Sequence, residues 1–200
     1  MSAASGTTAT SSPAREKVLA AAADLFYRKG FHAVGVEEIV RLAGVAKISM
    51  YRGFASKDDL AVAYLEERSR AFLEEWDQTF DRYRKAPRKQ LRAIMAYVVE
   101  RTEEDGYRGC PFINLSAEFP DPSHPARRVA AGIKQSIRDR FLRLATALNA
   151  PEPQKLADAW LLLFEGAYAL SQTLGAAAGV MGRSLVWAAV TLAETQLAAK

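Results

Sequence analysis

The chain has 200 residues, of which 50% are hydrophobic and 25% are charged, so it holds enough apolar material for one large domain or two small ones. One cysteine and two histidines exclude an internal disulfide framework and give a metal site little support, and no cofactor is expected. The formal net charge of +4 at pH 7 is a mild indication of a polyanionic partner.

The sequence predicts neither an N-terminal secretory signal nor a membrane-spanning segment. Residues 1–12 are rich in Ser, Thr, Ala and Gly, without a basic start or an apolar run, and are expected to form a disordered tail. The most apolar stretch, residues 159–181, is interrupted by Glu165, whose charge would cost about 2.5 kcal/mol or more in a bilayer. We therefore expect a cytoplasmic protein that makes no membrane contact.

Apolar residues recur at intervals of three and four along the whole chain, and no segment alternates in the manner of a strand. Ser12 and Ser56 are suited to cap helices, and Gly30 and Gly44 to end them. The fold class predicted is all-α without an internal repeat. Helices are expected over about 13–29, 36–43, 47–54 and 57–84, then from Pro87, Pro111 and Pro125, through Leu156–Leu174, and over about 183–198.

Residues 36–54 have the spacing of a helix-turn-helix motif. Two short helices are separated by a tight turn containing Gly44, and the preceding helix supplies the third wall of a small core. At 100° per residue, Met50 faces that core, whereas Ile48 and Arg52 point the opposite way. An outward Ile beside an Arg suits a major groove, where it can meet a thymine methyl while Arg binds a guanine edge.

Spacing alone leaves a second interpretation open, in which these charges are the solvated surface of an ordinary three-helix domain. The order of residues favours the first. The pattern AGVAK–MY–F–SKDDL closely resembles the TetR family of bacterial transcriptional regulators. The residues that carry the resemblance are Leu25, Phe26, Lys29, Gly30, Phe31, Ile39, Ala43, Gly44, Val45, Tyr51, Phe54, Ser56, Lys57 and Leu60.

The resemblance implies a three-helix DNA-binding head, residues 13–56 with the motif at about 35–54, and a six-helix domain, residues 57–200, for effector binding and dimerisation. It implies a homodimer that represses transcription from a palindromic operator until a small, partly apolar effector binds. Gly35 and Gly53 depart from the family, which commonly has Thr and a polar residue there. The DNA-binding residues implied are Gly35, Lys47, Ile48, Ser49, Tyr51, Arg52 and Lys57.

The segment 110–119 has a polar stripe at Cys110, Asn114 and Glu118, which is either a solvent face or the lining of a cavity. By resemblance, some nearby aromatic residues should line an effector pocket. The long helix that starts at Lys57 carries Trp76 and Phe80, so it is expected to act as a rigid link between that pocket and the DNA site. The predicted pocket residues are Trp76, Phe80, Tyr97, Cys110, Phe112, Asn114, Leu115, Glu118, Phe141, Phe164 and Tyr168.

Cys110 has two interpretations, a buried packing residue or a sensor thiol. The second would make the protein a regulator that responds to oxidants or electrophiles. An alternative of a different class is a helical enzyme that uses Cys110, Glu118 and Tyr168, although it gives no reason for the outward face at Ile48 and Arg52.

The last two predicted helices are apolar on more than one face, so each needs two partners. Because they are terminal, a symmetric four-helix interface between two copies is expected, and the resemblance agrees. The predicted interface residues are Leu156, Trp160, Leu163, Ala167, Leu170, Leu174, Val186, Val190 and Leu197.

Overall fold

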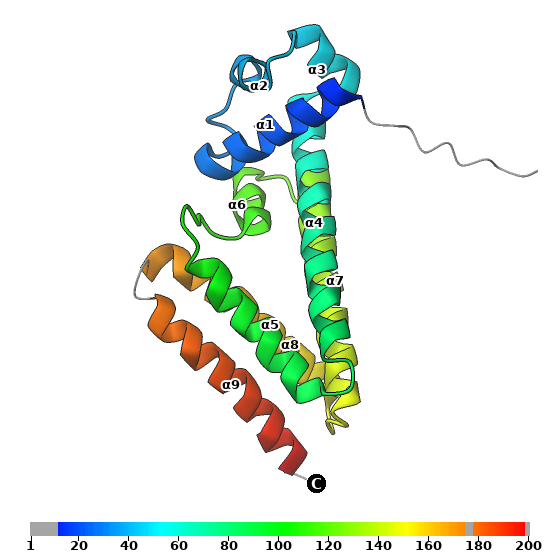
Figure 1. Cartoon of the computed structure of the whole chain (residues 1–200), viewed down its shortest axis with the longest axis vertical. Helices are drawn as coiled ribbons and strands as arrows, with labels where there is room; N and C mark the ends of the chain where they lie inside the picture. The colour runs from blue at the N-terminus through cyan, green and yellow to red at the C-terminus, as the bar shows by residue number, and fades with distance from the viewer. Residues whose placement is uncertain (1–11, 175–177, 199–200) are drawn as a thin grey trace, which may run out of the picture. The chain divides into compact units, whose positions relative to one another are not determined.

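The computed structural model describes residues 12–174 and 178–198, with side chains for 12–174 and 184–196, and every regular element in these ranges is a helix (Figure 1). The all-α prediction is confirmed. The helices are α1 (Pro13–Lys29), α2 (Val36–Ala43), α3 (Lys47–Gly53), α4 (Lys57–Arg82), α5 (Pro87–Thr102), α6 (Pro111–Glu118), α7 (Pro125–Ala147), α8 (Pro153–Leu174) and α9 (Ala178–Ala198).

One boundary prediction is wrong. α9 begins at Ala178 rather than near residue 183, so Gly179 and Gly182 lie inside a helix. A glycine in a helix costs about 1 kcal/mol relative to alanine, which packing elsewhere along an apolar helix can offset.

The N-terminal compact unit ends at Tyr64, beyond the boundary predicted at residue 56. The first turns of α4 belong to this unit because Leu60 is 0% exposed and Tyr64 is 2% exposed in its core. The ring of Phe26 from α1 joins them, with its centroid 5.3 Å from that of Phe31 and 6.1 Å from that of Tyr64. The helix-turn-helix is thus held by a core to which α1 and α4 both contribute.

Local capping fixes where the first helices begin and end. The Ser12 hydroxyl accepts a hydrogen bond from the backbone N–H of Arg15 at 3.2 Å, at the start of α1. Gly44 ends α2 with φ of 65°, a left-handed conformation in which a side chain would be strained. The conformation of Gly44 therefore fixes the direction in which the chain leaves α2 toward α3.

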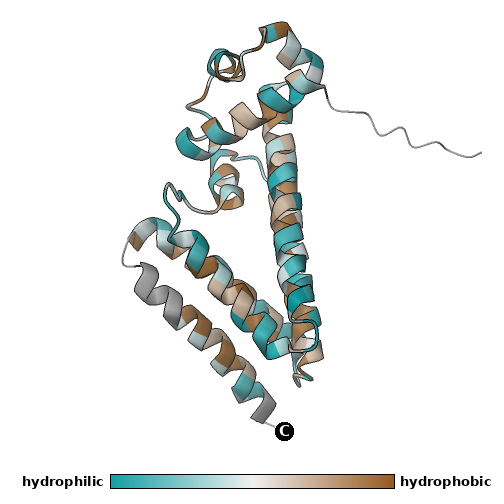
Figure 2. Cartoon of the chain, in the orientation of Figure 1, coloured by the Kyte–Doolittle hydropathy of each residue, from teal (hydrophilic) through white to brown (hydrophobic). Residues whose placement is uncertain are grey.

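The C-terminal unit, from Leu65 onward, packs its helices around a cluster of aromatic rings. Trp76, Phe141, Trp160 and Phe164 are each at most 3% exposed, and neighbouring centroids lie between 5.2 and 5.9 Å apart. Hydrophobic residues recur at intervals along each helix, as one buried face requires (Figure 2). No described helix is both long and apolar enough to cross a bilayer.

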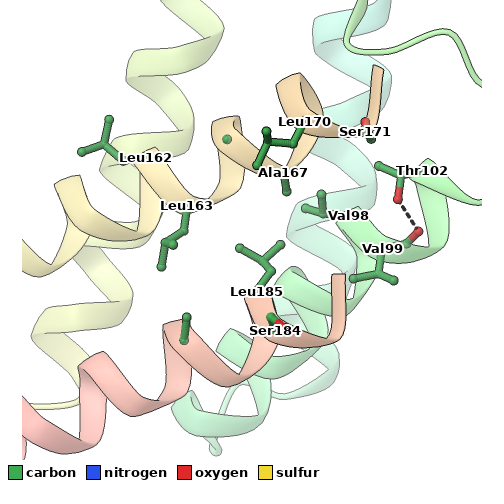
Figure 3. Close-up of a pocket in the computed structure, with 12 residues that line it drawn as sticks. Val98, Val99, Thr102, Leu162, Leu163, Ala167, Leu170, Ser171, Ser184 and Leu185 are labelled. Carbon is green, nitrogen blue, oxygen red and sulfur yellow. Dashed lines mark hydrogen bonds between the residues drawn. The ribbon is translucent and has the colours of Figure 1, made fainter. Parts of the chain in front are cut away.

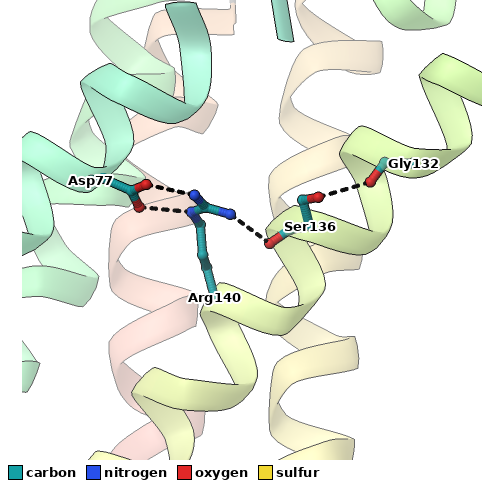
Figure 4. A network of polar contacts seen from close by, with 4 residues as sticks. All are labelled: Asp77, Gly132, Ser136 and Arg140. Atoms are coloured by element: carbon teal, nitrogen blue, oxygen red, sulfur yellow. Dashed lines mark hydrogen bonds and ion pairs between the residues drawn. The ribbon is translucent and has the colours of Figure 1, made fainter. Parts of the chain in front are cut away.

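Two directional contacts join helices of this unit. The Arg140 guanidinium on α7 donates to both carboxylate oxygens of Asp77 on α4, at 2.8 and 2.6 Å, and to the Ser136 carbonyl at 3.3 Å (Figure 4). The Trp160 indole N–H on α8 donates to the Ala189 carbonyl on α9 at 3.0 Å, in the buried interior. Such directional bonds hold the helices together and also fix their relative orientation.

Candidate functional site

The two faces predicted for α3 are confirmed by side-chain exposure. Met50 is 0% exposed and packs inward, whereas Ile48 is 61% and Tyr51 46% exposed, and Arg52 is also exposed. Ser49 is half-buried. α3 therefore presents an apolar group, a phenol and a guanidinium on one outward surface of the N-terminal unit.

An acidic residue that was not predicted from the sequence lies beside this surface. Lys47, at the start of α3, donates to the Glu37 carboxylate of α2 at 2.5 Å. This hydrogen bond and the attraction to Glu37 raise the pKa of Lys47, so the ammonium stays charged. Both groups are exposed, and an exposed ion pair is easily exchanged for another anion.

Lys57 and Gly35 lie at the starts of α4 and α2. The Lys57 ammonium is 4.0 Å from the centre of the Phe31 ring, a cation–π contact that holds the side chain along the N-terminal unit. Gly35 caps α2 through its backbone alone, and a Cβ added there would meet nothing within 4 Å. A hydroxyl residue would therefore fit at position 35.

The predicted aromatic pocket residues come together, but as a filled core. Trp76 stacks on Phe80 at 5.9 Å and meets Phe141 and Phe164 edge-on or tilted. Phe112 and Leu115 of α6 and Tyr168 of α8 are likewise buried, at 5%, 2% and 8% exposure. The Trp76 indole N–H is buried and finds no acceptor among the described residues. A ligand with a hydrogen-bond acceptor could pair this donor.

The polar stripe predicted on α6 divides between the interior and the surface. Cys110 is 4% exposed, whereas Asn114 and Glu118 are half-buried. The Asn114 side chain is held locally, because its amide donates to the Arg108 carbonyl at 2.8 Å and its oxygen accepts from Gln172 at 2.6 Å. Neither of the two simple interpretations, solvent face or cavity lining, describes all three residues.

A charged pair lies beside the cysteine. The Lys134 ammonium is 3.5 Å from the Cys110 sulfur and 2.6 Å from a carboxylate oxygen of Glu165, so it is shared between them. Nearby, burial raises the pKa of Tyr168 well above its ordinary value. Among the described residues, no three His, Cys, Asp or Glu side chains are placed to hold a metal ion.

An apolar cavity of about 260 Å³ lies between α5, α8 and α9, and sequence reasoning did not anticipate it. Figure 3 shows side chains of all three helices around a shared space. Among the described lining residues none carries a charge, and the polar side chains are the hydroxyls of Thr102, Ser171 and Ser184. The lining residues are Val98, Val99, Thr102, Leu162, Leu163, Gly166, Ala167, Leu170, Ser171, Ser184, Leu185 and Ala188.

The predicted dimer interface needs correction. Leu156, Trp160 and Val190 are 1%, 0% and 8% exposed, so their own protomer encloses them and they leave the predicted set. On α8, therefore, only the N-terminal part of the three-four seam is enclosed by the same chain. Leu163, Ala167 and Val186 are half-buried, Leu170 and Leu174 are exposed, and the side chain of Leu197 lies outside the described residues.

Large exposed apolar residues nevertheless gather on α8 and α9. Leu162 is 73% and Trp187 70% exposed, and Leu170, Leu174 and Leu192 are between 37% and 43% exposed. We call these five residues the apolar face. The sequence signal for Leu162 and Trp187 was available, because both helices are apolar on more than one side.

Comparison with known proteins agrees with this organisation. The family model for bacterial regulatory proteins of the tetR family matches residues 18–64. A crystal structure of a tetR-type transcriptional regulator from Streptomyces avermitilis is 34% identical, with a TM-score of 0.77 over 92% of this chain and 98% of that chain. The transcriptional regulator AcuR of Cereibacter sphaeroides is 29% identical over 77% of this chain and 74% of its own. The transcriptional repressor NemR of Escherichia coli is 30% identical over 56% and 57%. Each of these relatives is named as a transcriptional regulator or repressor.

Proposed function

Because the chain belongs to the TetR family of bacterial transcriptional regulators, we propose that it is a homodimeric repressor that leaves a palindromic operator when a small effector binds. The observation that carries the proposal is the outward face of α3, with Ile48 61% exposed beside Tyr51 and Arg52. In a major groove, Ile48 would meet a thymine methyl and Arg52 the O6 and N7 atoms of a guanine. The repressor NemR, a relative, supports the direction of control.

The remaining contacts would go to DNA phosphates. Lys47, Ser49 and Tyr51 lie on α3, and Lys57 begins α4, where backbone N–H groups also favour a phosphate. Lys47 would exchange its exposed partner Glu37 for a phosphate at little cost. Gly35 has no hydroxyl to offer, so it would contribute its backbone alone.

The test uses a duplex that the wild-type protein selects from random-sequence DNA. Arg52→Ala should weaken binding by about 1–3 kcal/mol and relax base preference at one position in each half-site. Lys57→Ala should weaken all sequences alike and lower the slope of log K against log salt by about one. Arg28→Ala is the matched control, because Arg28 is an exposed cation of α1 that pairs with Asp24. Equal base preference for Arg52→Ala and wild type would refute the placement of α3.

Two copies would dimerise through the apolar face on α8 and α9. Five large apolar side chains on two adjacent helices are each at least 37% exposed, and exposed apolar side chains of this size commonly mark a surface that a partner covers. A two-fold axis brings the same surface of each copy together. Dimerisation sets the distance between the two α3 helices, which must match half-sites about 34 Å or a multiple of it apart.

For the effector we propose the cavity between α5, α8 and α9. Its volume of about 260 Å³ and its lining favour a small uncharged molecule, mostly apolar, with at most a few polar atoms within reach of Thr102, Ser171 or Ser184. Leu162 and Leu170 belong both to this cavity and to the apolar face. A bound effector would therefore alter the interface, and with it the spacing of the half-sites read.

The aromatic cluster is a second effector site to be tested, because the Trp76 indole N–H has no acceptor among the described residues. Val99→Phe fills the cavity from α5, away from the apolar face, and should abolish release of operator by an inducer found in a screen. Trp76→Phe should leave release unchanged. Loss of release with Trp76→Phe, and not with Val99→Phe, would move the effector to the cluster.

A second candidate function is thiol sensing, which the 3.5 Å contact between Lys134 and Cys110 favours, since a nearby cation stabilises a thiolate. Against it, Cys110 is only 4% exposed. Cys110→Ser should retain release by a reversible inducer. If it abolishes release, and oxidants or electrophiles release the wild type, thiol sensing replaces effector binding.

A further inference from the structure

The side chain of Arg15, in the first turn of α1, occupies the space beside the last residue of α3. A Cβ added at Gly53 would lie 3.2 Å from the Arg15 Cγ and 3.4 Å from its Cβ. The Arg15 guanidinium carbon is 4.5 Å from the centre of the Phe54 ring, which follows Gly53. Ser12 caps α1 at the Arg15 backbone, which fixes the residue at which α1 begins.

This arrangement leaves N–H donors of the Arg15 guanidinium available for a further hydrogen bond. A guanidinium that stacks on a ring directs its N–H donors outward in its own plane, where they match the geometry of a phosphate. Within the described part of the chain, no carboxylate forms an ion pair with Arg15, unlike Arg28 at the other end of α1. Arg15 is half-buried, so its stem is covered and little side-chain freedom remains to be lost on binding.

The position of Arg15 also suits the nucleic acid. α3 has seven residues, a length of about 10 Å, and the major groove is about 12 Å wide. Both ends of α3 therefore come close to the phosphates that flank the groove. The C-terminal end carries Arg52 for the bases, but Gly53 supplies no side chain of its own.

We propose that Arg15 is a further DNA-binding residue, which contacts an operator phosphate at the C-terminal end of α3 from the space that Gly53 leaves open. The inference rests on the proposed placement of α3 in the major groove. Gly53 thus has a positive role, because any side chain there would displace the arginine or require it to move.

The experiment measures binding of the selected duplex and of a random duplex of the same length between about 50 and 200 mM salt. Arg15→Met keeps apolar cover on Phe54 without the charge, and should weaken both duplexes equally, by about fivefold to tenfold. The salt slope should fall by about 0.9, the value for one phosphate. Arg28→Ala, with the same loss of charge, should keep the wild-type slope.

A rescue distinguishes a phosphate contact from packing. In Arg15→Ala, which frees the space beside position 53, the added substitution Gly53→Lys should restore the lost slope by returning a cation to this end of α3. A wild-type slope for Arg15→Met, while Arg52→Ala loses base preference, would overturn the inference and leave the proposed function intact. If Arg52→Ala also binds as the wild type does, α3 does not contact the bases. The role of Arg15 and the proposed function are then both refuted.

Discussion

Trp187 gives the sharpest test of the proposed dimer. This α9 residue is 70% exposed. A tryptophan side chain has up to about 250 Å² of surface, so roughly 170 Å² of Trp187 is available for a partner to bury. Its burial would contribute about 4 kcal/mol in each protomer at 25 cal/mol per Å². Alanine would retain some contact, and truncations at the centre of interfaces commonly cost about 2–4 kcal/mol. At about 2 kcal/mol for each of two copies, we expect Trp187→Ala to raise the dimer dissociation constant about 1000-fold.

Sedimentation velocity over nanomolar to micromolar concentrations measures this constant. Leu42→Ala is the control, because Leu42 is 51% exposed on α2, outside the apolar face. Circular dichroism should report unchanged helix content for Trp187→Ala, since the protomer scarcely buries this side chain. If the dimers of Trp187→Ala and Leu42→Ala have the same dissociation constant, the partner does not cover this part of α9, and the interface lies elsewhere.

Three further predictions concern stability and ionisation. Gly35→Ser should raise the free energy of unfolding by about 0.5–1 kcal/mol in urea titrations, because it caps α2, restricts the unfolded chain and meets no neighbour; a loss would show hidden strain. Asp77→Asn should lower that free energy by about 1 kcal/mol or less, because Asp77 is half-exposed although its bond to Arg140 is bidentate. Arg140→Lys in the wild type should retain only part of the interaction with Asp77. Burial raises the pKa of Tyr97 and of Tyr168 above the ordinary 10. The unfolded chain ionises these phenols first, so the stability they contribute is complete below pH 10 and falls as pH rises beyond it. Tyrosinate absorbance of both should then appear together with unfolding, and early ionisation in the folded protein would contradict this.

The features that the sequence predicted well are those set by neighbours along the chain. The two faces of α3 follow from helical geometry once Gly44 fixes the turn, which is why Met50 and Ile48 were assigned correctly. The caps at Ser12 and Gly30 are equally local. The start of α9 was misplaced because propensity disfavours Gly179 and Gly182, whereas packing can override propensity.

The features that it could not predict depend on which segments meet in space. Periodicity identifies an apolar seam on α8 but not the helix that covers it, so Trp160 was assigned to a partner and is instead enclosed by its own chain. A cavity is a volume that side chains leave unfilled, and no local pattern encodes it. The ion pair between Lys47 and Glu37 joins α3 to α2, and the Arg15 side chain of α1 lies beside Gly53 of α3. Both features also depend on how different helices pack.

The bond from the Trp160 indole to the Ala189 carbonyl has a consequence for how copies meet. It fastens α9 to α8 inside one protomer, in an environment without competing water. In the proposed dimer, each chain would therefore form its apolar face before it met a partner, and two copies would separate without unfolding. Mixed dimers of differently tagged chains should consequently form at the dissociation rate of the interface, far faster than global unfolding. In the proposed dimeric repressor, one defective copy would in this way enter existing dimers and silence the intact subunit beside it.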